Sequence, residues 1–230
     1  MKKLASVQEL ESLRKKIRAS RDPNRLRITV CGGTGCRAHG SIEVAEALAG
    51  ELRRRRLRTK VELKTSGCHG FCEKGPVVVV EPQGIFYHAV GRKNREQDAQ
   101  EIIRTTVMEG RPVERLLYED PATRQRIVTY TEIPFYTRQT RVALGNNGKI
   151  DPFSIEDYLA ADGYTALVRV LKMSPEEVID SIRRSGLRGR GGAGFPTGQK
   201  WRFCREAKDR TTRYIICNAD EGDPGAFMDR

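Results

Sequence analysis

Four of the six cysteines lie in two glycine-rich loops, and each loop directly follows a predicted strand. Strands are predicted over residues 26–30 and 61–63, where β-forming residues are frequent. The first strand runs into CGGTGC, and the second is followed by SGCHGFCEKGP. A fold can therefore bring the two loops together. The cysteines concerned are Cys31, Cys36, Cys68 and Cys72.

The spacing C-x4-C-x31-C-x3-C admits three interpretations. Disulfides are disfavoured, because the chain shows no export signal. Structural zinc usually uses C-x2–4-C knuckles, and this set is looser than most. A [2Fe–2S] cluster needs four thiolates and donors toward its sulfurs, which glycine-rich loops supply as unobstructed N–H groups. The pattern favours the iron–sulfur cluster, with zinc next. His39 and His69 lack the spacing of a Rieske site, so we interpret them as loop residues or donors around the ligands.

Periodicity and turn signals predict a small α/β domain with a mixed sheet over residues 1–110. The pattern weakens over residues 111–150, which we interpret as a linker with short strands, and residues 151–230 begin a second domain. Ser174 and Glu177 form a capping box that opens a helix through Arg184. The remaining predicted elements are helices at 7–19, 41–56, 94–108 and about 198–207, a hairpin of strands at 77–80 and 85–88, short strands at 127–130 and 141–144, and a strand at 214–217.

Composition limits the class of protein. The hydrophobic fraction of 38% and the charged fraction of 31% are typical of a globular chain. No apolar run approaches the ~20 residues of a membrane helix, and the N-terminus lacks the apolar core of a secretory signal. We therefore expect a cytoplasmic protein without membrane insertion. The net charge of +12 comes without a nucleic-acid recognition signature, so it favours anionic cofactors or acidic partner subunits.

A second glycine-rich stretch, SGLRGRGGAGFPTGQKW, covers residues 185–201. Its six glycines allow backbone N–H groups to surround a phosphate, and Arg188, Arg190 and Lys200 match the charge of such a ligand. A flexible linker would not hold Phe, Pro, Trp and three cations in such dense order. Residues 189–194 also fit G-x-G-x-x-G, but a Rossmann loop must follow a strand, and here a helix precedes it.

The cysteine spacing, with TGC at the first pair and SGCHGFCEKGP at the second, resembles the thioredoxin-like [2Fe–2S] ferredoxin module over about residues 1–110. This family includes the small iron–sulfur subunit of NADH dehydrogenases. The resemblance implies that Cys31, Cys36, Cys68 and Cys72 are the cluster ligands.

The glycine stretch and the following YIICNADEGDPGAFMDR resemble the FMN- and NADH-binding subunit of respiratory complex I over roughly residues 135–230. They are closer still to the equivalent subunit of NAD-linked, electron-bifurcating hydrogenases and formate dehydrogenases. The resemblance implies an α/β FMN-binding domain of the complex I flavoprotein type. The FMN contacts would be Gly189, Arg190, Gly191, Lys200, Asn218, Asp220 and Glu221, and the nicotinamide pocket would involve Gly192, Ala193, Gly194, Phe195 and Phe203.

Two details set the chain apart from that pattern. Gly222 and Asp223 stand where the complex I pattern has Ser and Glu, which puts the nucleotide contact there in question. Phe203 is equally consistent with ordinary core packing. The chain stops three residues after CNADEGDPGAF, so we expect a C-terminally truncated piece. An acidic loop and a [4Fe–4S] motif of the family would then lie beyond residue 230.

The resemblances together imply an electron-transfer oxidoreductase subunit with NAD(H) as substrate, FMN and a [2Fe–2S] cluster, acting with other subunits of a redox complex. No side chain is required as a general acid or base, because the cofactors carry the chemistry. We expect the cluster to assemble in these 230 residues and NADH oxidation to need the part beyond them. Two alternatives remain: a non-enzymatic [2Fe–2S] conduit or docking module, and a zinc-binding regulatory protein.

Overall fold

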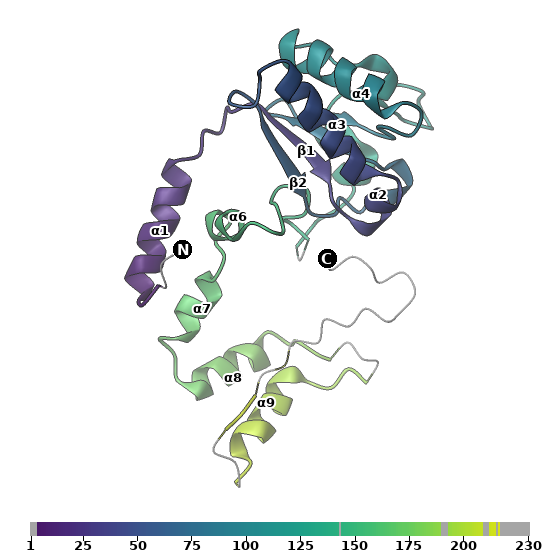
Figure 1. The fold of residues 1–230 in the computed structure, drawn as a ribbon. Coiled ribbons are helices and arrows are strands. Elements are labelled where there is room, and N and C mark those ends of the chain that lie inside the picture. Colours follow the sequence, from purple (N-terminus) through teal and green to yellow (C-terminus); the bar gives the residue numbers. More distant parts are fainter. Residues whose placement is uncertain (1–3, 143, 190–192, 209–211, 215, 217–230) are drawn as a thin grey trace. The chain divides into compact units, whose positions relative to one another are not determined.

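The computed structural model describes residues 4–142, 144–189, 193–208, 212–214 and 216. These residues form two compact units, which divide after Ala161 (Figure 1). Each unit is described below by itself. None of the helices in the described part of the chain is both long enough and apolar enough to cross a membrane.

The first unit is built on a mixed four-stranded sheet, as predicted. The strand order is β2-β1-β3-β4, in which β1 and β2 are parallel and the other neighbours are antiparallel. The strands are β1 (Arg27–Cys31), β2 (Glu62–Ser66), β3 (Val78–Glu81) and β4 (Ile85–Tyr87). The parallel pair is central for the site, because both of its strands lead into a cysteine loop.

Helices cover one face of this sheet. α3 (Ser41–Arg54) contacts β1 and β2, and it packs beside α4 (Arg95–Glu101), which continues as the π-helical η2 (Ile102–Met108) (Figure 1). Apolar residues at helical spacing on α3 meet Ile28 and Val30 of β1 in one buried cluster. The predicted helices at 41–56 and 94–108 are therefore confirmed to within two residues at their ends.

The other sheet face is covered by the stretch expected to be a linker. Phe86 and Val79 point to this face and form a second buried cluster with Tyr118 and Ile133. All of β3 except its last residue is buried, so both faces of the sheet are apolar and need a cover. The covering elements are β5 (Tyr118–Glu119), β6 (Arg126–Ile127), η4 (Tyr130–Glu132) and α5 (Pro134–Thr137), whereas Leu116 of η3 (Glu114–Leu116) belongs to the first cluster. No strand forms at the described residues of 141–144.

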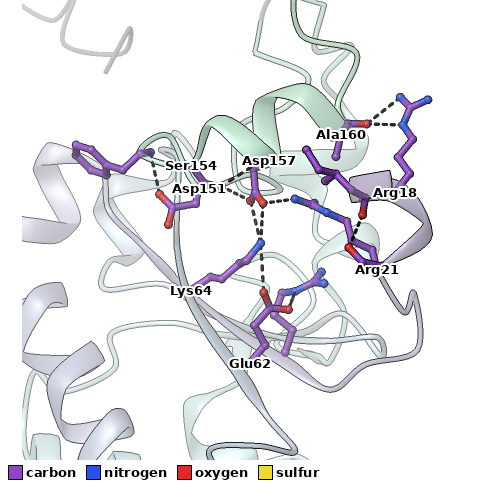
Figure 2. Close-up of polar contacts among 12 residues, drawn as sticks. Arg18, Arg21, Glu62, Lys64, Asp151, Ser154, Asp157 and Ala160 are labelled. Carbon is purple, nitrogen blue, oxygen red and sulfur yellow. Dashed lines mark hydrogen bonds and ion pairs between the residues drawn. The ribbon is translucent and has the colours of Figure 1, made fainter. Parts of the chain in front are cut away.

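Two further helices of this unit contact each other, α1 (Val7–Ala19), which has the predicted bounds, and α6 (Ile155–Ala160). Figure 2 shows the polar contacts around them. Asp157 of α6 accepts hydrogen bonds from Arg21 at 2.6 Å and Lys64 of β2 at 2.9 Å. Arg18 donates to the carbonyl of Ala160 at 2.8 Å. Ion pairs thus connect α6 with β2 and with Arg21, two residues after α1, and a hydrogen bond connects α6 with α1 itself.

The second unit contains α7 (Thr165–Val170), α8 (Pro175–Arg184) and α9 (Thr197–Glu206). The predicted capping box at Ser174 is present, because Ser174 accepts from the Glu177 N–H and the Glu177 carboxylate accepts from the Ser174 N–H. α8 and α9 pack closely at Gly198, where a Cβ atom would lie 2.7 Å from the Arg183 Cα. The strand predicted at 214–217 falls partly outside the described residues, and Tyr214 and Ile216 are not in a strand.

Candidate functional site

The ends of the parallel strands bring the two cysteine loops together. Cys31 is opposite Ser66 in the register of β1 and β2, and the Gly32 N–H donates to the Ser66 carbonyl at 2.9 Å. The carboxyl ends of neighbouring parallel strands meet at one edge of a sheet, so the loops that follow them start side by side. The prediction that all four cysteines lie in loops was wrong at two of them: Cys36 lies on a short helix, α2 (Thr34–Ala38), and Cys72 begins the 3-10 helix η1 (Cys72–Lys74).

Glycines from one loop lie against cysteine sulfurs of the other. A Cβ atom on Gly33 would lie 2.7 Å from the Cys68 Sγ, and one on Gly35 would lie 2.9 Å from the Cys72 Sγ. A Cβ atom on Gly75 would lie 2.7 Å from the Cys36 Sγ. No side chain fits at these positions. The loops therefore approach each other at glycines, and cysteine sulfurs occupy the space beside them.

The thiols are close enough to influence one another. Hydrogen bonding with Cys36, together with burial, raises the pKa of Cys31 to about 11. The hydrogen bond with Cys31 is the main cause that raises the pKa of Cys68, and burial is the second cause. Burial and the neighbouring Cys68 raise the pKa of Cys72, whereas the hydrogen bond from Cys31 lowers that of Cys36. Four thiolates so close together repel, so all four are ionised only around a positively charged centre.

Backbone N–H groups point toward the sulfurs, as the glycine content predicts. The Gly70 N–H donates to the Cys68 Sγ at 3.3 Å. The N–H group of Val77 helps to lower the pKa of Cys36, and that of Gly35 partly offsets the rise in the pKa of Cys72. Such donors stabilise negative charge on sulfur. The donor set therefore fits an iron–sulfur cluster held by four thiolates.

The arrangement also bears on zinc. No three His, Cys, Asp or Glu side chains among the described residues are grouped as ligands of a single metal ion. A structural zinc needs four ligands at ~2.3 Å from one centre, whereas a two-iron cluster is larger and is held by two pairs of thiolates. Iron and zinc analysis of the purified chain distinguishes the two groups.

The two histidines differ in their surroundings. His39 is exposed, and its Nδ1 lies 2.7 Å from the Gly35 carbonyl. His69 is 5% exposed, and its Nδ1 lies 2.9 Å from the Tyr136 hydroxyl. Burial and, to a smaller extent, the charge of Arg141 lower the pKa of His69 to about 4, so the ring is neutral at pH 7.

In the second unit, the two described ends of the glycine stretch are hydrogen-bonded to each other. The Gly189 N–H donates to the Phe195 carbonyl at 2.9 Å, and the Thr197 N–H donates to the Leu187 carbonyl at 3.0 Å. Arg188 also donates to the carbonyl of Gly194 at 3.1 Å. The stretch is therefore a closed loop between α8 and α9. The helix before it agrees with the rejection of a Rossmann loop.

The predicted cofactor residues of this unit are only partly described. Phe195 and Phe203 are 41% and 55% exposed, and their ring centroids lie 6.3 Å apart. Ala193 is also exposed, and Lys200 lies exposed on α9. The remaining predicted contacts fall outside the described residues, so the structure does not place them beside the loop: Arg190, Gly191, Gly192, Asn218, Asp220 and Glu221.

Two family models match the chain. Residues 8–106 match the thioredoxin-like [2Fe–2S] ferredoxin, and residues 182–230 match the Nuo51 FMN-binding domain. The chain joins a thioredoxin-like [2Fe–2S] ferredoxin domain to the start of an FMN-binding domain. The fold and the two cofactors expected from the sequence are thereby confirmed, and the residues that hold the cofactors stay predictions.

Curated relatives and a solved structure are similar to parts of the chain. The NADP-reducing hydrogenase subunit HndC of Solidesulfovibrio fructosivorans is 58% identical over 93 residues, which cover 40% of this chain and 19% of the relative. An NADH-quinone oxidoreductase subunit of Aquifex aeolicus is 58% identical over 77 residues, covering 34% and 18%. The chain thus spans about a fifth of the length of these relatives. A thioredoxin-like [2Fe–2S] ferredoxin from Aquifex aeolicus is 32% identical over 40% of this chain and 87% of its own, with a TM-score of 0.35.

Sequence reasoning missed the aromatic residues that cover the second cysteine loop of the ferredoxin domain. Phe71, between Cys68 and Cys72, stacks on Phe135 with ring centroids 4.1 Å apart. Tyr136 meets the same ring edge-on at 6.1 Å. The signal was present as the aromatic density of YTEIPFY at residues 130–136, which is unusual for a linker.

Proposed function

We propose that this chain is part of an electron-transfer oxidoreductase subunit of the NADH dehydrogenase type. Electrons would pass between NAD(P)H, FMN and iron–sulfur clusters within a multi-subunit redox complex, such as a hydrogenase or a formate dehydrogenase. The observation that carries the proposal is the gathering of four cysteines at one sheet edge, in a chain that continues into an FMN-binding domain. A cytoplasmic location is part of the proposal.

In the ferredoxin domain, four thiolates would hold the cluster. Cys31, Cys36 and Cys68 are buried, whereas Cys72 is exposed. The buried side keeps water from the sulfurs, and the exposed side leaves a short path for an electron to or from a partner. An iron–sulfur cluster supplies one-electron transfer, and FMN links such steps to the two-electron chemistry of nicotinamide.

In the second unit, the closed glycine loop would bind FMN and the nicotinamide nucleotide. Gly189 and Lys200 would contact FMN together with Arg190 and Gly191, and Phe195 would stack on a ring. The exposure of Phe195 and Lys200 in this unit is consistent with a ligand-binding role. Asn218, Asp220 and Glu221 complete the proposed flavin contacts.

The cluster is tested on the chain purified without oxygen. We expect about two irons and two sulfides per chain and a rhombic electron paramagnetic resonance signal after reduction. Cys68→Ser removes one ligand and is expected to lower the iron content several-fold. Cys204→Ser is the matched control, because Cys204 is exposed on α9, and it should keep the full signal. Stoichiometric zinc without iron would contradict the proposal.

The flavin part is tested separately. FMN retained by the chain, or by a longer chain that extends it, and dye reduction that depends on NADH would support the oxidoreductase. A cluster without FMN binding in either chain would leave the electron conduit as the function. Lys200→Ala is expected to weaken FMN binding without changing the cluster signal, because Lys200 and the four cysteines belong to different units.

A further inference from the structure

Tyr136, Arg141 and Gly148 lie beyond the matched ferredoxin region, yet all three contact His69 in the second cysteine loop. The Tyr136 hydroxyl lies 2.9 Å from the His69 Nδ1, and the Arg141 guanidinium donates to the His69 carbonyl at 2.7 Å. A Cβ atom on Gly148 would lie 2.7 Å from the His69 ring. His69 is therefore held from three sides by this segment.

The contact from Arg141 reaches a cysteine sulfur through a single peptide group. The His69 carbonyl and the Gly70 N–H belong to the same peptide unit. Arg141 donates to the carbonyl end, and the N–H end donates to the Cys68 Sγ at 3.3 Å. Hydrogen bonds in such a chain polarise one another, and a charged donor has the larger effect. The guanidinium thus strengthens the N–H···S hydrogen bond at Cys68.

The guanidinium is fixed in place by aromatic rings. Its carbon lies 5.0 Å from the centroid of Tyr136 and 5.7 Å from that of Phe135. Phe135 in turn stacks on Phe71 of the cysteine loop at 4.1 Å. Stacked cation–π contacts suit the planar guanidinium better than an ammonium group. Arg141 is therefore held by the same cluster of side chains that covers the loop.

We propose that Arg141 is a positioning residue that raises the reduction potential of the cluster through the peptide between His69 and Gly70. The inference rests on the proposed cluster at the four cysteines. Reduction adds one negative charge, and hydrogen bonds to the sulfurs and nearby positive charge stabilise the reduced form. Removing the guanidinium weakens the hydrogen bond to the Cys68 sulfur and removes the nearby positive charge. A role in packing alone would change the stability of the loop and leave the potential where it is.

The test is a redox titration of the full chain followed by electron paramagnetic resonance. Arg141→Gln is expected to move the midpoint potential to a more negative value. Arg141→Lys is expected to move it less, because lysine keeps the positive charge but loses the planar guanidinium. Arg138→Gln removes the same charge from an exposed side chain near the end of α5 and should leave the potential unchanged. An intact signal at the unchanged potential in Arg141→Gln would overturn the inference.

Two further outcomes are separable. If Arg141→Gln does not retain a cluster, the midpoint potentials of Arg141→Lys and Arg138→Lys are compared instead. A negative shift in Arg141→Lys alone supports the inference, and equal potentials in the two variants overturn it. If the unsubstituted chain itself shows no [2Fe–2S] signal, the proposed function fails, and the inference fails with it.

Discussion

At the scale of single residues, the site depends on three glycines, which carry no side chain. Gly33, Gly35 and Gly75 each approach a cysteine of the opposite loop more closely than a Cβ atom allows. The backbone of Gly33 has φ −63° and ψ 154°, which any residue adopts. Position 33 therefore requires glycine because of the limited space and not because of its backbone conformation. A substitution there tests the steric effect alone.

We predict that Gly33→Ala prevents full assembly of the cluster. The new methyl group would lie 2.7 Å from the Cys68 Sγ, so either the loop or the thiolate must move. Iron content and the visible absorption of the purified chain measure the effect, and a several-fold loss is expected. Gly50→Ala is the control, because Gly50 lies within α3 with only Arg53 within 4 Å of the added carbon. Alanine there should raise stability by about 0.5–1 kcal/mol. A normal iron content in Gly33→Ala would contradict the steric argument.

At the scale of elements, one hydroxyl connects three segments of the core. Tyr87 at the end of β4 is fully buried, and its oxygen accepts from the Val113 N–H at 3.0 Å. The same hydroxyl is hydrogen-bonded to Thr106 of η2. Burial raises the pKa of Tyr87, so the phenol stays neutral and able to donate. The residues after η2 are thereby tied to the sheet that supports the cysteine loops.

We predict that Tyr87→Phe destabilises the ferredoxin domain by about 1–3 kcal/mol, because the buried Val113 N–H loses its acceptor. Urea unfolding followed by circular dichroism measures the change. Thr106→Val removes the other partner, and the double variant should cost less than the sum of the two single variants. Additive effects would show that the two hydroxyls do not interact.

At the scale of the whole first unit, charged side chains connect α6 with β2 and with the turn that follows α1. Asp157, whose side chain is 3% exposed, pairs with Arg21 and Lys64 and accepts from the Asp151 N–H at 2.9 Å (Figure 2). Burial by itself would raise the pKa of Asp157, but this N–H group and the two cations outweigh burial and lower it below its usual value. The carboxylate is thus a point where three elements meet.

We predict that this carboxylate makes stability depend on pH. A pKa that is lower in the folded chain contributes stability above the unfolded value of about 3.9, and this contribution is lost as pH falls through the folded pKa. Asp157→Asn should therefore cost roughly 2 kcal/mol at pH 6, and the difference from the unsubstituted chain should shrink below pH 4. Chemical unfolding at several pH values measures it. Glu119→Gln, at an exposed ion pair with Arg124, should change stability by less than about 1 kcal/mol. An equal difference at all pH values would refute the prediction.

Local signals in the sequence determined the helices α1 and α8 and the two cysteine loops. Capping residues and apolar periodicity act over a few neighbours, so the bounds 7–19 and 175–184 could be predicted to the residue. The spacing of the cysteines and the glycine stretch likewise pointed to both cofactors, because these motifs are contiguous or nearly so.

The role of residues 111–150 was decided by tertiary contacts. A continuous apolar run such as β3 shows that both faces are buried, but it does not say what covers them. The cover comes from Tyr118, Ile133 and Phe135, whose short elements have weak patterns of their own. Arg141 meets His69 across 72 positions, and no spacing rule links them. Such contacts follow from packing a second apolar sheet face, which is a property of the assembled sheet and not of any one segment.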